Sequence, residues 1–384
     1  MPEQKAALKP WSSPELESFR AEVRRFVAAE ITPNETRWAE AHCVDRALWS
    51  KAGELGLLCA DIPDTYGGSG GTFAHQAVVF EELAYAGDTA FNVSVHAIAA
   101  HYVLNQGTEE QKKEFLPRLA SGELVGAIAM SEPGAGSDLQ GVRTTAKLEG
   151  DHYVVNGGKT FISNGSLADF LILVCRTGDE PGAKGISLLL VETKNLDGYR
   201  VGKNLHKLGQ HGNDTCELFF ENVKVPAKNV LGGVPGKGFG HLMTELPYER
   251  VLVAIGAVCA MELAVRITVD YCRERKAFGK TLLDLQNTRF VLAEGKTSCV
   301  VARTFLDKCI SAIIDGTCDT VLASMAKYWT SDLQCKVIDD CLQLFGGYGY
   351  MVEYQIANLY ADARVQRIYA GSNEIMKELI ARSL

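Results

Sequence analysis

The sequence predicts an α+β protein in which a helical segment is followed by a strand-rich segment and then by a second helical segment. Early in the chain, apolar residues recur at helical spacing. In the middle, short runs rich in Val, Ile, Leu and Phe alternate with turn residues, and long helical stretches return after about residue 238. Because elements of one type are grouped, segregated domains are favoured over a doubly wound sheet. We place the domains at residues 1–124, 125–236 and 237–384.

Helix start signals support the helical character of the first domain. Pro14 follows Ser13 and precedes two nearby glutamates, so proline lies in the first turn and negative charge lies at the positive end of the helix dipole. A second helix is expected over residues 72–86. Residues 108–111, Thr-Glu-Glu-Gln, have the form of a capping box and predict the start of another helix.

The middle domain is expected to be a sandwich or barrel, because short apolar runs are separated by turns such as Gly150-Asp151. The runs that predict strands are 142–147, 153–156, 170–175, 186–192 and 216–225. The third domain is expected to hold long helices over residues 240–275, 282–314 and 320–345, and a last helix over 373–382.

Composition excludes some classes of protein. The 384 residues include 39 Lys+Arg and 47 Asp+Glu, and a net charge of −8 argues against a nucleic-acid partner. The 11 cysteines form no CxxC pair, which indicates a reducing compartment. The first residues show no signal core, and the longest uncharged apolar run is Val251 to Met261. We therefore expect no integral membrane association and a cytoplasmic location, or the mitochondrial matrix if a transit peptide has been removed.

Several catalytic motifs are absent or out of context. The sequence has no GxGxxG, no GxxxxGK[ST] and no HExxH, so nucleotide binding through those loops and a zinc site have no support, and no metal is expected. Residues 67–71, Gly-Gly-Ser-Gly-Gly, fit the nucleophile elbow of serine hydrolases. The elbow needs a strand leading directly into its first glycine, whereas Pro63 to Tyr66 form a turn there. A glycine loop is therefore favoured over a hydrolase.

The segment Ala129 to Asp138, Ala-Met-Ser-Glu-Pro-Gly-Ala-Gly-Ser-Asp, carries the densest chemistry. Its two glycines allow backbone N–H groups to approach a ligand closely, and its serines and aspartate can hydrogen-bond over a short range. The segment lies where helices give way to strands, a junction that favours clefts. On local chemistry alone, a ligand site and a surface turn fit equally well.

This segment resembles the signature of the acyl-CoA dehydrogenases, and four more segments resemble later motifs of that family. They are Lys159 to Gly165, Arg273 to Lys280, Gln343 to Tyr350 and Tyr369 to Ile375. The five motifs occur in the family's order over almost the whole chain. The resemblance, closest to the long-chain type, implies a helical N-terminal domain, a barrel-like middle domain and a C-terminal four-helix bundle.

The resemblance implies an FAD enzyme that converts an acyl thioester to a trans-2-enoyl thioester. It assigns to the flavin ring Met130, Ser131 and Gly136, with Phe161, Ile162 and Ser163 on the other side. Ser137 belongs to the same cofactor-binding segment and faces the pantetheine arm. Arg275 and Phe278 are assigned to the pyrophosphate end, together with four residues of a neighbouring subunit, Gln286, Gln343, Gly346 and Gly347. Ser372 and Glu374 complete the cofactor contacts.

The family needs a carboxylate that takes the α proton. Many members carry it directly after the position of Tyr369, where this chain has Ala370. A subset that includes the long-chain and isovaleryl enzymes carries it on a C-terminal helix instead, and Leu246 to Arg250 resembles the long-chain version. Glu245 and Glu249 cannot be separated by periodicity, but family position selects Glu249.

The place of Glu249 beside a long apolar stretch predicts a raised pKa, which suits a base that accepts a proton from carbon. The alternative is that Glu249 pairs with Arg250 or supports an exposed helix turn alongside Glu245, one turn earlier. The resemblance assigns the thioester to four further residues, Tyr248, Arg250, Ala370 and Gly371, with the Ala370 N–H polarising the carbonyl.

The function expected from the resemblance is dehydrogenation of an acyl-CoA, of medium or long chain, in fatty-acid β-oxidation. A homotetramer and an electron-transferring flavoprotein as oxidant are expected with it. Two alternatives stay open: a dehydrogenase of acyl-carrier-protein thioesters, and a non-catalytic acyl-thioester-binding protein marked by Ala370. The tail pocket is placed at the helix around Phe91 to Tyr102, although core packing explains that composition equally well.

Overall fold

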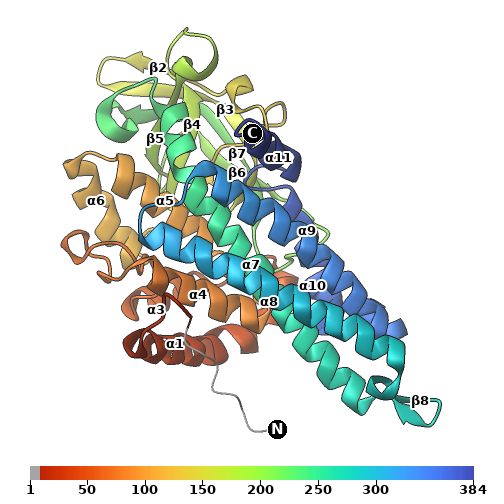
Figure 1. The fold of residues 1–384 in the computed structure, drawn as a ribbon. Coiled ribbons are helices and arrows are strands. Elements are labelled where there is room, and N and C mark those ends of the chain that lie inside the picture. The colour runs from red at the N-terminus through yellow and green to blue at the C-terminus, as the bar shows by residue number, and fades with distance from the viewer. Residues whose placement is uncertain (1–8) are drawn as a thin grey trace.

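In the computed structural model, which describes residues 9–384, a seven-stranded sheet follows one set of helices and precedes another (Figure 1). The opening residues, where we expected no signal sequence, lie outside the described residues. The first set comprises α1 (Pro14–Phe26), α2 (Glu35–Ala41), α3 (Arg46–Glu54), α4 (Phe73–Ala86), α5 (Val93–Gln106) and α6 (Glu109–Ala120).

The start signals of the first domain are confirmed. The Ser13 hydroxyl accepts a hydrogen bond from the Leu16 N–H at 3.1 Å, and α1 begins at Pro14. Thr108 and Gln111 form the expected capping box of α6, each side chain accepting from the other's backbone N–H. These ends could be predicted because a cap satisfies backbone donors within one turn.

The sheet has the strand order β1-β4-β2-β3-β7-β6, with β5 paired to β4. The strands are β1 (Gly126–Ala129), β2 (Thr145–Glu149), β3 (His152–Ser163), β4 (Phe170–Arg176), β5 (Ile186–Glu192), β6 (Tyr199–Asn204) and β7 (Thr215–Pro226). We did not predict β1 and β6, and β3 runs seven residues past the expected end at Asn156. β1 has only four residues, three of them Gly or Ala, and β6 contains charges and a glycine, so both give a weak strand signal.

Two hydrophobic cores meet at β4, whose successive side chains alternate between them. Phe170, Ile172 and Val174 belong to the larger core, which they share with the helices. Leu171 and Leu173 belong to a second core, which also contains side chains of β3 and β7. The two halves of the sheet therefore enclose a core of their own, as the predicted sandwich or barrel requires.

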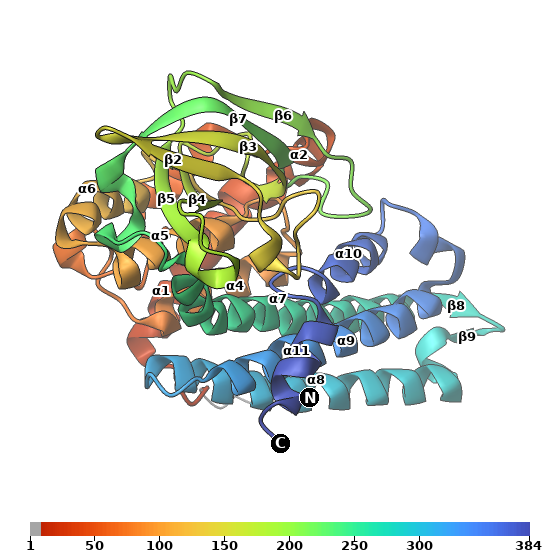
Figure 2. The ribbon, with the colours of Figure 1, turned by 90° about the horizontal axis from the view of Figure 1, so that it is seen from above.

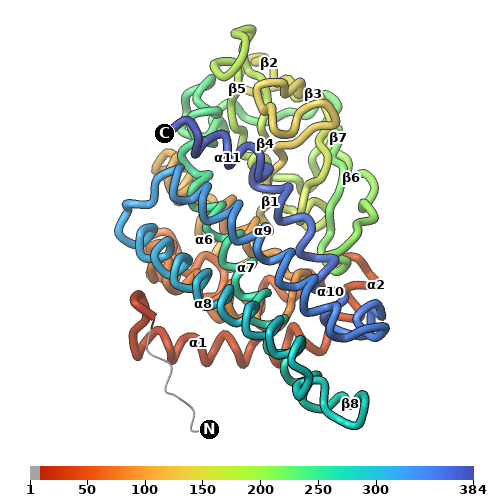
Figure 3. The backbone as a smooth tube through the Cα atoms, turned by 45° about the vertical axis from the view of Figure 1, so that its right-hand side comes forward, coloured from red at the N-terminus to blue at the C-terminus, as the bar shows by residue number. Residues whose placement is uncertain are grey.

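The C-terminal domain is built on three long helices, α7 (Gly238–Glu274), α8 (Gln286–Ile314) and α9 (Thr320–Phe345), which pack side by side (Figures 2 and 3). The fourth bundle member is short and was not predicted: α10 (Gln355–Ala363) packs on α7 and α9. The last helix, α11 (Asn373–Ala381), packs on α9, and the hairpin β8 (Lys276–Ala277) and β9 (Lys280–Thr281) joins α7 to α8.

One helix of the described chain, α7, is long and apolar enough to cross a membrane by length and composition. In its most apolar 18-residue window, 72% of the residues are buried inside the protein. Core helices commonly have this combination, because they are apolar on all sides.

Candidate active site

The structure brings two of the predicted flavin segments together. The Lys159 ammonium on β3 donates to the Met130 carbonyl at 3.1 Å and to Glu132 Oε1 at 2.8 Å. Next to it, the Thr160 N–H donates to the Ser131 carbonyl at 3.0 Å. The turn that follows β1 is thus fixed to the second half of β3, and half-buried Met130 and Ser131 lie beside the 161–163 segment.

A bulge in β3 displays Phe161. The register with β7 shifts between Lys159 and Ile162, and Phe161 takes a left-handed φ of 60° with 68% of its surface exposed. Such a conformation costs about 1–2 kcal/mol for a residue with a side chain and is typical of functional sites. Ile162 corrects the prediction for this segment: its side chain lies in the second core, so only its backbone can face a cofactor.

Gly136 and Ser137 lie in an exposed turn. A Cβ built on Gly136 would meet no atom within 4 Å, so nothing in the chain itself requires glycine there.

Glu249 on α7 is buried, and its Oε1 accepts a hydrogen bond of 2.8 Å from the hydroxyl of Tyr102 on α5. Burial raises the pKa of Glu249 to about 7; the Glu245 charge adds to the rise, and Tyr102 and Arg250 oppose it. The predicted direction of the pKa change is therefore found. Among the described ion pairs none joins Glu249 to Arg250, which removes the alternative of an exposed paired turn.

Glu245 is distinguished from Glu249 by its hydrogen bonds. Its two oxygens accept from the side-chain amides of Asn105 at 2.9 Å and Gln106 at 2.7 Å, both on the last turn of α5. Glu249 has one oxygen occupied, by Tyr102. The structure therefore gives Glu249 an open oxygen and gives Glu245 none.

The other predicted thioester residues lie around Glu249 in different ways. Arg250 is buried and donates to the Ser324 hydroxyl at 3.2 Å. Its guanidinium lies near Gly371: a side-chain Cβ at that position would be 4.0 Å from Arg250 Nη2. Tyr248 faces the N-terminal domain instead: its ring stacks on His101 at 4.0 Å and its hydroxyl lies 3.4 Å from Asp61.

A buried lysine holds the turn that carries Ala370 and Gly371. Lys327 on α9 donates to the Gly371 carbonyl at 2.7 Å and to Asn373 Oδ1 at 2.8 Å. Burial, together with the nearby Arg250 charge, lowers the pKa of Lys327 to about 8. The turn is left-handed at both Ala370, with φ of 52°, and Gly371, with φ of 87°.

Replacing Ala370 by Gly is expected to stabilise the fold. A left-handed alanine costs about 1–2 kcal/mol, whereas the added freedom of glycine in the unfolded chain costs about 0.4–1 kcal/mol. The net gain in the free energy of unfolding should be about 0.5–1 kcal/mol in urea titrations. The matched control, Ala357→Gly within α10, should lose about 1 kcal/mol. A loss at position 370 equal to that of the control would contradict the proposed strain.

Arg275 lies at the far end of α7, in a cavity of about 510 Å³ that also contains Gln343, Gly346 and Gly347. Its guanidinium lies 5.4 Å from the centre of the Tyr348 ring. We expected Arg275 and these three residues on different subunits, and that division is wrong, because one chain brings them together. The arginine fork, an amide and a glycine turn with φ of 59° at Gly346 form a donor set that suits a pyrophosphate.

The remaining predicted cofactor residues lie outside that cavity. Phe278 projects from the tip of the β8–β9 hairpin with 92% of its surface exposed, and Gln286 begins α8. Ser372 precedes α11, and Glu374 is exposed in its first turn. Exposed positions of this kind are available to a ligand or to a second chain.

The cluster around Arg275, called the arginine cluster below, lies far from Glu249 within one chain. Arg275 follows Glu249 by about 26 residues of helix, which at 1.5 Å per residue is about 39 Å. Figure 2 shows β8 at the end of the long helices, away from the large sheet. The turn at Ser131 and the exposed Phe161 ring suit the flavin ring, and the Arg275 cavity suits the pyrophosphate. These two parts of a candidate FAD site lie far apart in the folded chain.

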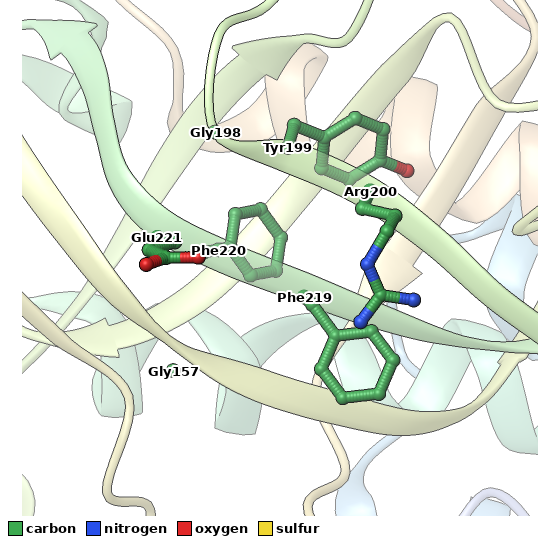
Figure 4. A pocket seen from close by; sticks show the side chains of 7 residues that line it. All are labelled: Gly157, Gly198, Tyr199, Arg200, Phe219, Phe220 and Glu221. Atoms are coloured by element: carbon green, nitrogen blue, oxygen red, sulfur yellow. The ribbon is translucent and has the colours of Figure 1, made fainter.

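A second hollow, of about 500 Å³, lies on the sheet where β3, β6 and β7 are adjacent (Figure 4). Its most distinctive contact is the Arg200 guanidinium, 4.3 Å over the Phe219 ring. The hollow is lined by Gly157, Gly198, Tyr199, Arg200, Phe219, Phe220 and Glu221. It contains none of the predicted site residues.

Two other sequence features can be placed. The Gly-Gly-Ser-Gly-Gly segment follows the short 3-10 turn Asp64–Tyr66 rather than a strand, and the Ser69 hydroxyl donates to the Gly56 carbonyl at 2.9 Å. It is a loop, as we favoured. In residues 9–384, no cluster of three or more His, Cys, Asp or Glu side chains could hold a metal ion.

Comparison with known proteins assigns each part of the chain to one family. The matching families are "Acyl-CoA dehydrogenase, N-terminal domain" at residues 13–123, "Acyl-CoA dehydrogenase, middle domain" at 127–223 and "Acyl-CoA dehydrogenase, C-terminal domain" at 236–384. These matches confirm the resemblance drawn from the five motifs. They also confirm the α+β class with helical, sheet and helical domains.

Relatives match over nearly the whole chain. The "Long-chain specific acyl-CoA dehydrogenase, mitochondrial" of Sus scrofa is 49% identical over 97% of this chain and 87% of its own. A crystal structure of acyl-CoA dehydrogenase from Geobacillus kaustophilus is 43% identical, with a TM-score of 0.95 over 98% of this chain and 99% of that one. An acyl-CoA dehydrogenase from Bacillus anthracis complexed with FAD is 30% identical, with a TM-score of 0.90 over 98% of this chain and 68% of that one.

Proposed function

Because the chain belongs to the acyl-CoA dehydrogenase family, we propose that it oxidises the Cα–Cβ bond of a medium- or long-chain acyl-CoA to a trans-2-enoyl-CoA, with Glu249 as the base. The family is FAD-dependent, and the relatives named for long-chain substrates support the chain length. Fatty-acid β-oxidation is the setting in which such a product is consumed.

One observation carries the assignment of the base. Glu249 is buried, its pKa is raised to about 7, and one of its oxygens is open, while position 370 offers only a methyl group. A carboxylate with a pKa of about 7 is about half deprotonated at pH 7, and it is a stronger base than an exposed carboxylate. Glu245 has the burial but lacks the open oxygen.

The residues of the chain divide the remaining work. The Glu249 carboxylate takes the α proton and becomes a carboxylic acid, and the Ala370 N–H stabilises the negative charge that develops on the thioester oxygen. Lys327 holds the turn that carries this N–H through its hydrogen bond to the Gly371 carbonyl. FAD, when bound, supplies the acceptor for the β hydride. Ser131 and Phe161 would border its ring, and Arg275 of a neighbouring chain would bind its pyrophosphate.

The experiment that tests the function uses the purified holoenzyme under anaerobic conditions. A yellow protein whose flavin absorbance is bleached by acyl-CoA is the expected result. A panel of saturated acyl-CoAs should give the highest kcat/KM at medium or long chain length.

Residues 91–102, where we placed the tail pocket, are largely buried in the larger core, so core packing accounts for much of their composition.

Two alternatives have distinct outcomes in the same assay. Equal or faster bleaching by an acyl-carrier-protein thioester than by the matching acyl-CoA would favour a biosynthetic role. A yellow protein that binds acyl-CoA without bleaching would favour a non-catalytic acyl-thioester-binding protein. The open, buried base favours the enzyme over the binding protein, because binding alone needs no such group.

We also propose a homotetramer that passes electrons to an electron-transferring flavoprotein. The distance of about 39 Å between Glu249 and Arg275 supports assembly, because the arginine cluster of one chain is then free to serve the flavin of another. Exposed apolar side chains near that cluster, such as Phe278 and Tyr350, support a buried interface there. Light scattering gives the mass of the assembly.

All eleven cysteines are free thiols, which supports the reducing cytoplasm as the location.

A further inference from the structure

Side chains near the C-terminal end of α5 donate hydrogen bonds to two carboxylates of α7, those of Glu245 and Glu249. Tyr102, Asn105 and Gln106 all donate to them: the phenol to Glu249 and the two amides to Glu245. Tyr102 is fully buried, and its hydroxyl has no other hydrogen-bond partner among residues 9–384. Because a phenol has one proton to donate, that proton is directed to Glu249 Oε1.

The two oxygens of Glu249 are therefore different. Oε1 is occupied by Tyr102 at 2.8 Å. Oε2 has no hydrogen-bond partner among the described residues, and it is not among the fully enclosed polar atoms that lack one, so some of its surface is open. A proton that reaches the carboxylate thus has one oxygen to bind.

We propose that Tyr102 is a positioning residue for the reaction: it holds the Glu249 carboxylate in one rotamer with Oε2 directed to the substrate, and it stabilises the charged form that acts as base. This inference rests on the proposed function of Glu249. A hydrogen bond to a carboxylate is about twice as strong as one to a neutral acid, so Tyr102 favours the unprotonated state. Burial keeps the pKa of Tyr102 well above its usual value, so the phenol remains a donor at every working pH.

Other charged groups around the carboxylate act in both directions. On α7, Glu245 raises the pKa of Glu249 and Arg250 lowers it. On α5, the His101 ring lies 3.0 Å from Asp61 and beside Glu245; burial acts to lower its pKa, but these carboxylates raise it overall. Tyr102 is the hydrogen-bond donor that contacts the base itself. Removing Tyr102 therefore takes away the direct hydrogen bond to the carboxylate, which removing a neighbouring charge does not.

The test is Tyr102→Phe in the holoenzyme, with two readouts. The first is exchange of the substrate α hydrogen for deuterium in D2O, which follows the base alone; the second is flavin reduction against pH. We expect exchange about 10-fold slower at pH 7 and a controlling pKa higher by about 1, since the hydrogen bond that stabilises the charged carboxylate is lost and one pKa unit is a tenfold change in the protonation equilibrium. Tyr153→Phe, which removes a buried phenol in the sheet, should change neither.

A second variant covers the case in which Tyr102→Phe folds poorly. Replacement of Tyr102 by 3-fluorotyrosine, a stronger donor of the same shape, should move the controlling pKa downward. If flavin content is normal and both variants leave the pKa and the exchange rate unchanged, the role of Tyr102 is overturned while the base stands. If Glu249→Gln exchanges the α hydrogen at the wild-type rate, the proposed function itself fails.

Discussion

Glu249→Gln is expected to lower the rate of flavin reduction by about 10³-fold, since a positioned general base contributes about 10²–10⁴-fold. The amide has the shape of the carboxylate and still accepts from Tyr102, so the fold and the flavin content should be retained. Stopped-flow mixing with acyl-CoA under anaerobic conditions measures the rate. Bleaching at the wild-type rate would contradict the assignment.

Glu245→Gln is the matched control for the assignment of the base. It removes a buried carboxylate one turn away, but one whose two oxygens already accept from Asn105 and Gln106. We expect flavin reduction within about 10-fold of the wild type, because no proton transfer is lost. Its largest effect should be a lower pKa for Glu249, since the nearby negative charge is gone.

The raised pKa of Glu249 makes both the activity and the stability of the wild type depend on pH. Activity of the wild type should be lost as the pH falls through about 7, because the base must be unprotonated. Stability changes in the opposite sense: between the usual pKa of 4.5 and about 7, the unfolded chain has released a proton that the folded chain retains, so stability falls as the pH rises. Above pH 7, Glu249→Gln should therefore be more stable than the wild type by up to about 3 kcal/mol.

How far the sequence predicts this protein depends on how local each signal is. The caps at Ser13 and Thr108 act within one turn and were predicted to the residue. The short strand β1 and the polar strand β6 were missed, because pairing with β4 and β7 stabilises them rather than their own composition. The left-handed conformations of Phe161 and Ala370 had no sequence signal, since neither residue is glycine.

The same limit applies to the site. Family resemblance placed Glu249 and grouped Met130 with Phe161, and the structure brings those two segments together. It could not supply partners that are distant in sequence: Tyr102 lies 147 residues from Glu249, and Lys327 lies 44 residues from Gly371. Neither residue lies in a recognisable motif. Their burial and their hydrogen-bond partners are set by the tertiary structure, so the sequence gives no sign of them. The residues that tune the site were therefore the ones missed.

Lys159→Met should have the largest effect on stability. The Lys159 side chain is fully buried, and it is the cation paired with Glu132, whose side chain is 7% exposed. Burial alone would raise the pKa of Glu132, but Lys159 and the Thr144 hydroxyl outweigh it and hold the pKa below its usual value. Removing one partner of such a pair leaves a buried charge uncompensated, which costs about 3–5 kcal/mol.

The same substitution should also release flavin, because Lys159 is what ties the Met130 carbonyl to β3. Urea unfolding and the ratio of flavin to protein absorbance measure the two effects. Adding Glu132→Gln to Lys159→Met should recover part of the loss, since the uncompensated charge is removed. Lys147→Met, at an exposed position of β2, is the control and should change stability by less than about 0.5 kcal/mol. If Lys159→Met behaved like Lys147→Met, the turn at Met130 would be held by the Thr160 hydrogen bond and the strand pairing alone, and the buried pair would have no part in shaping the cofactor site.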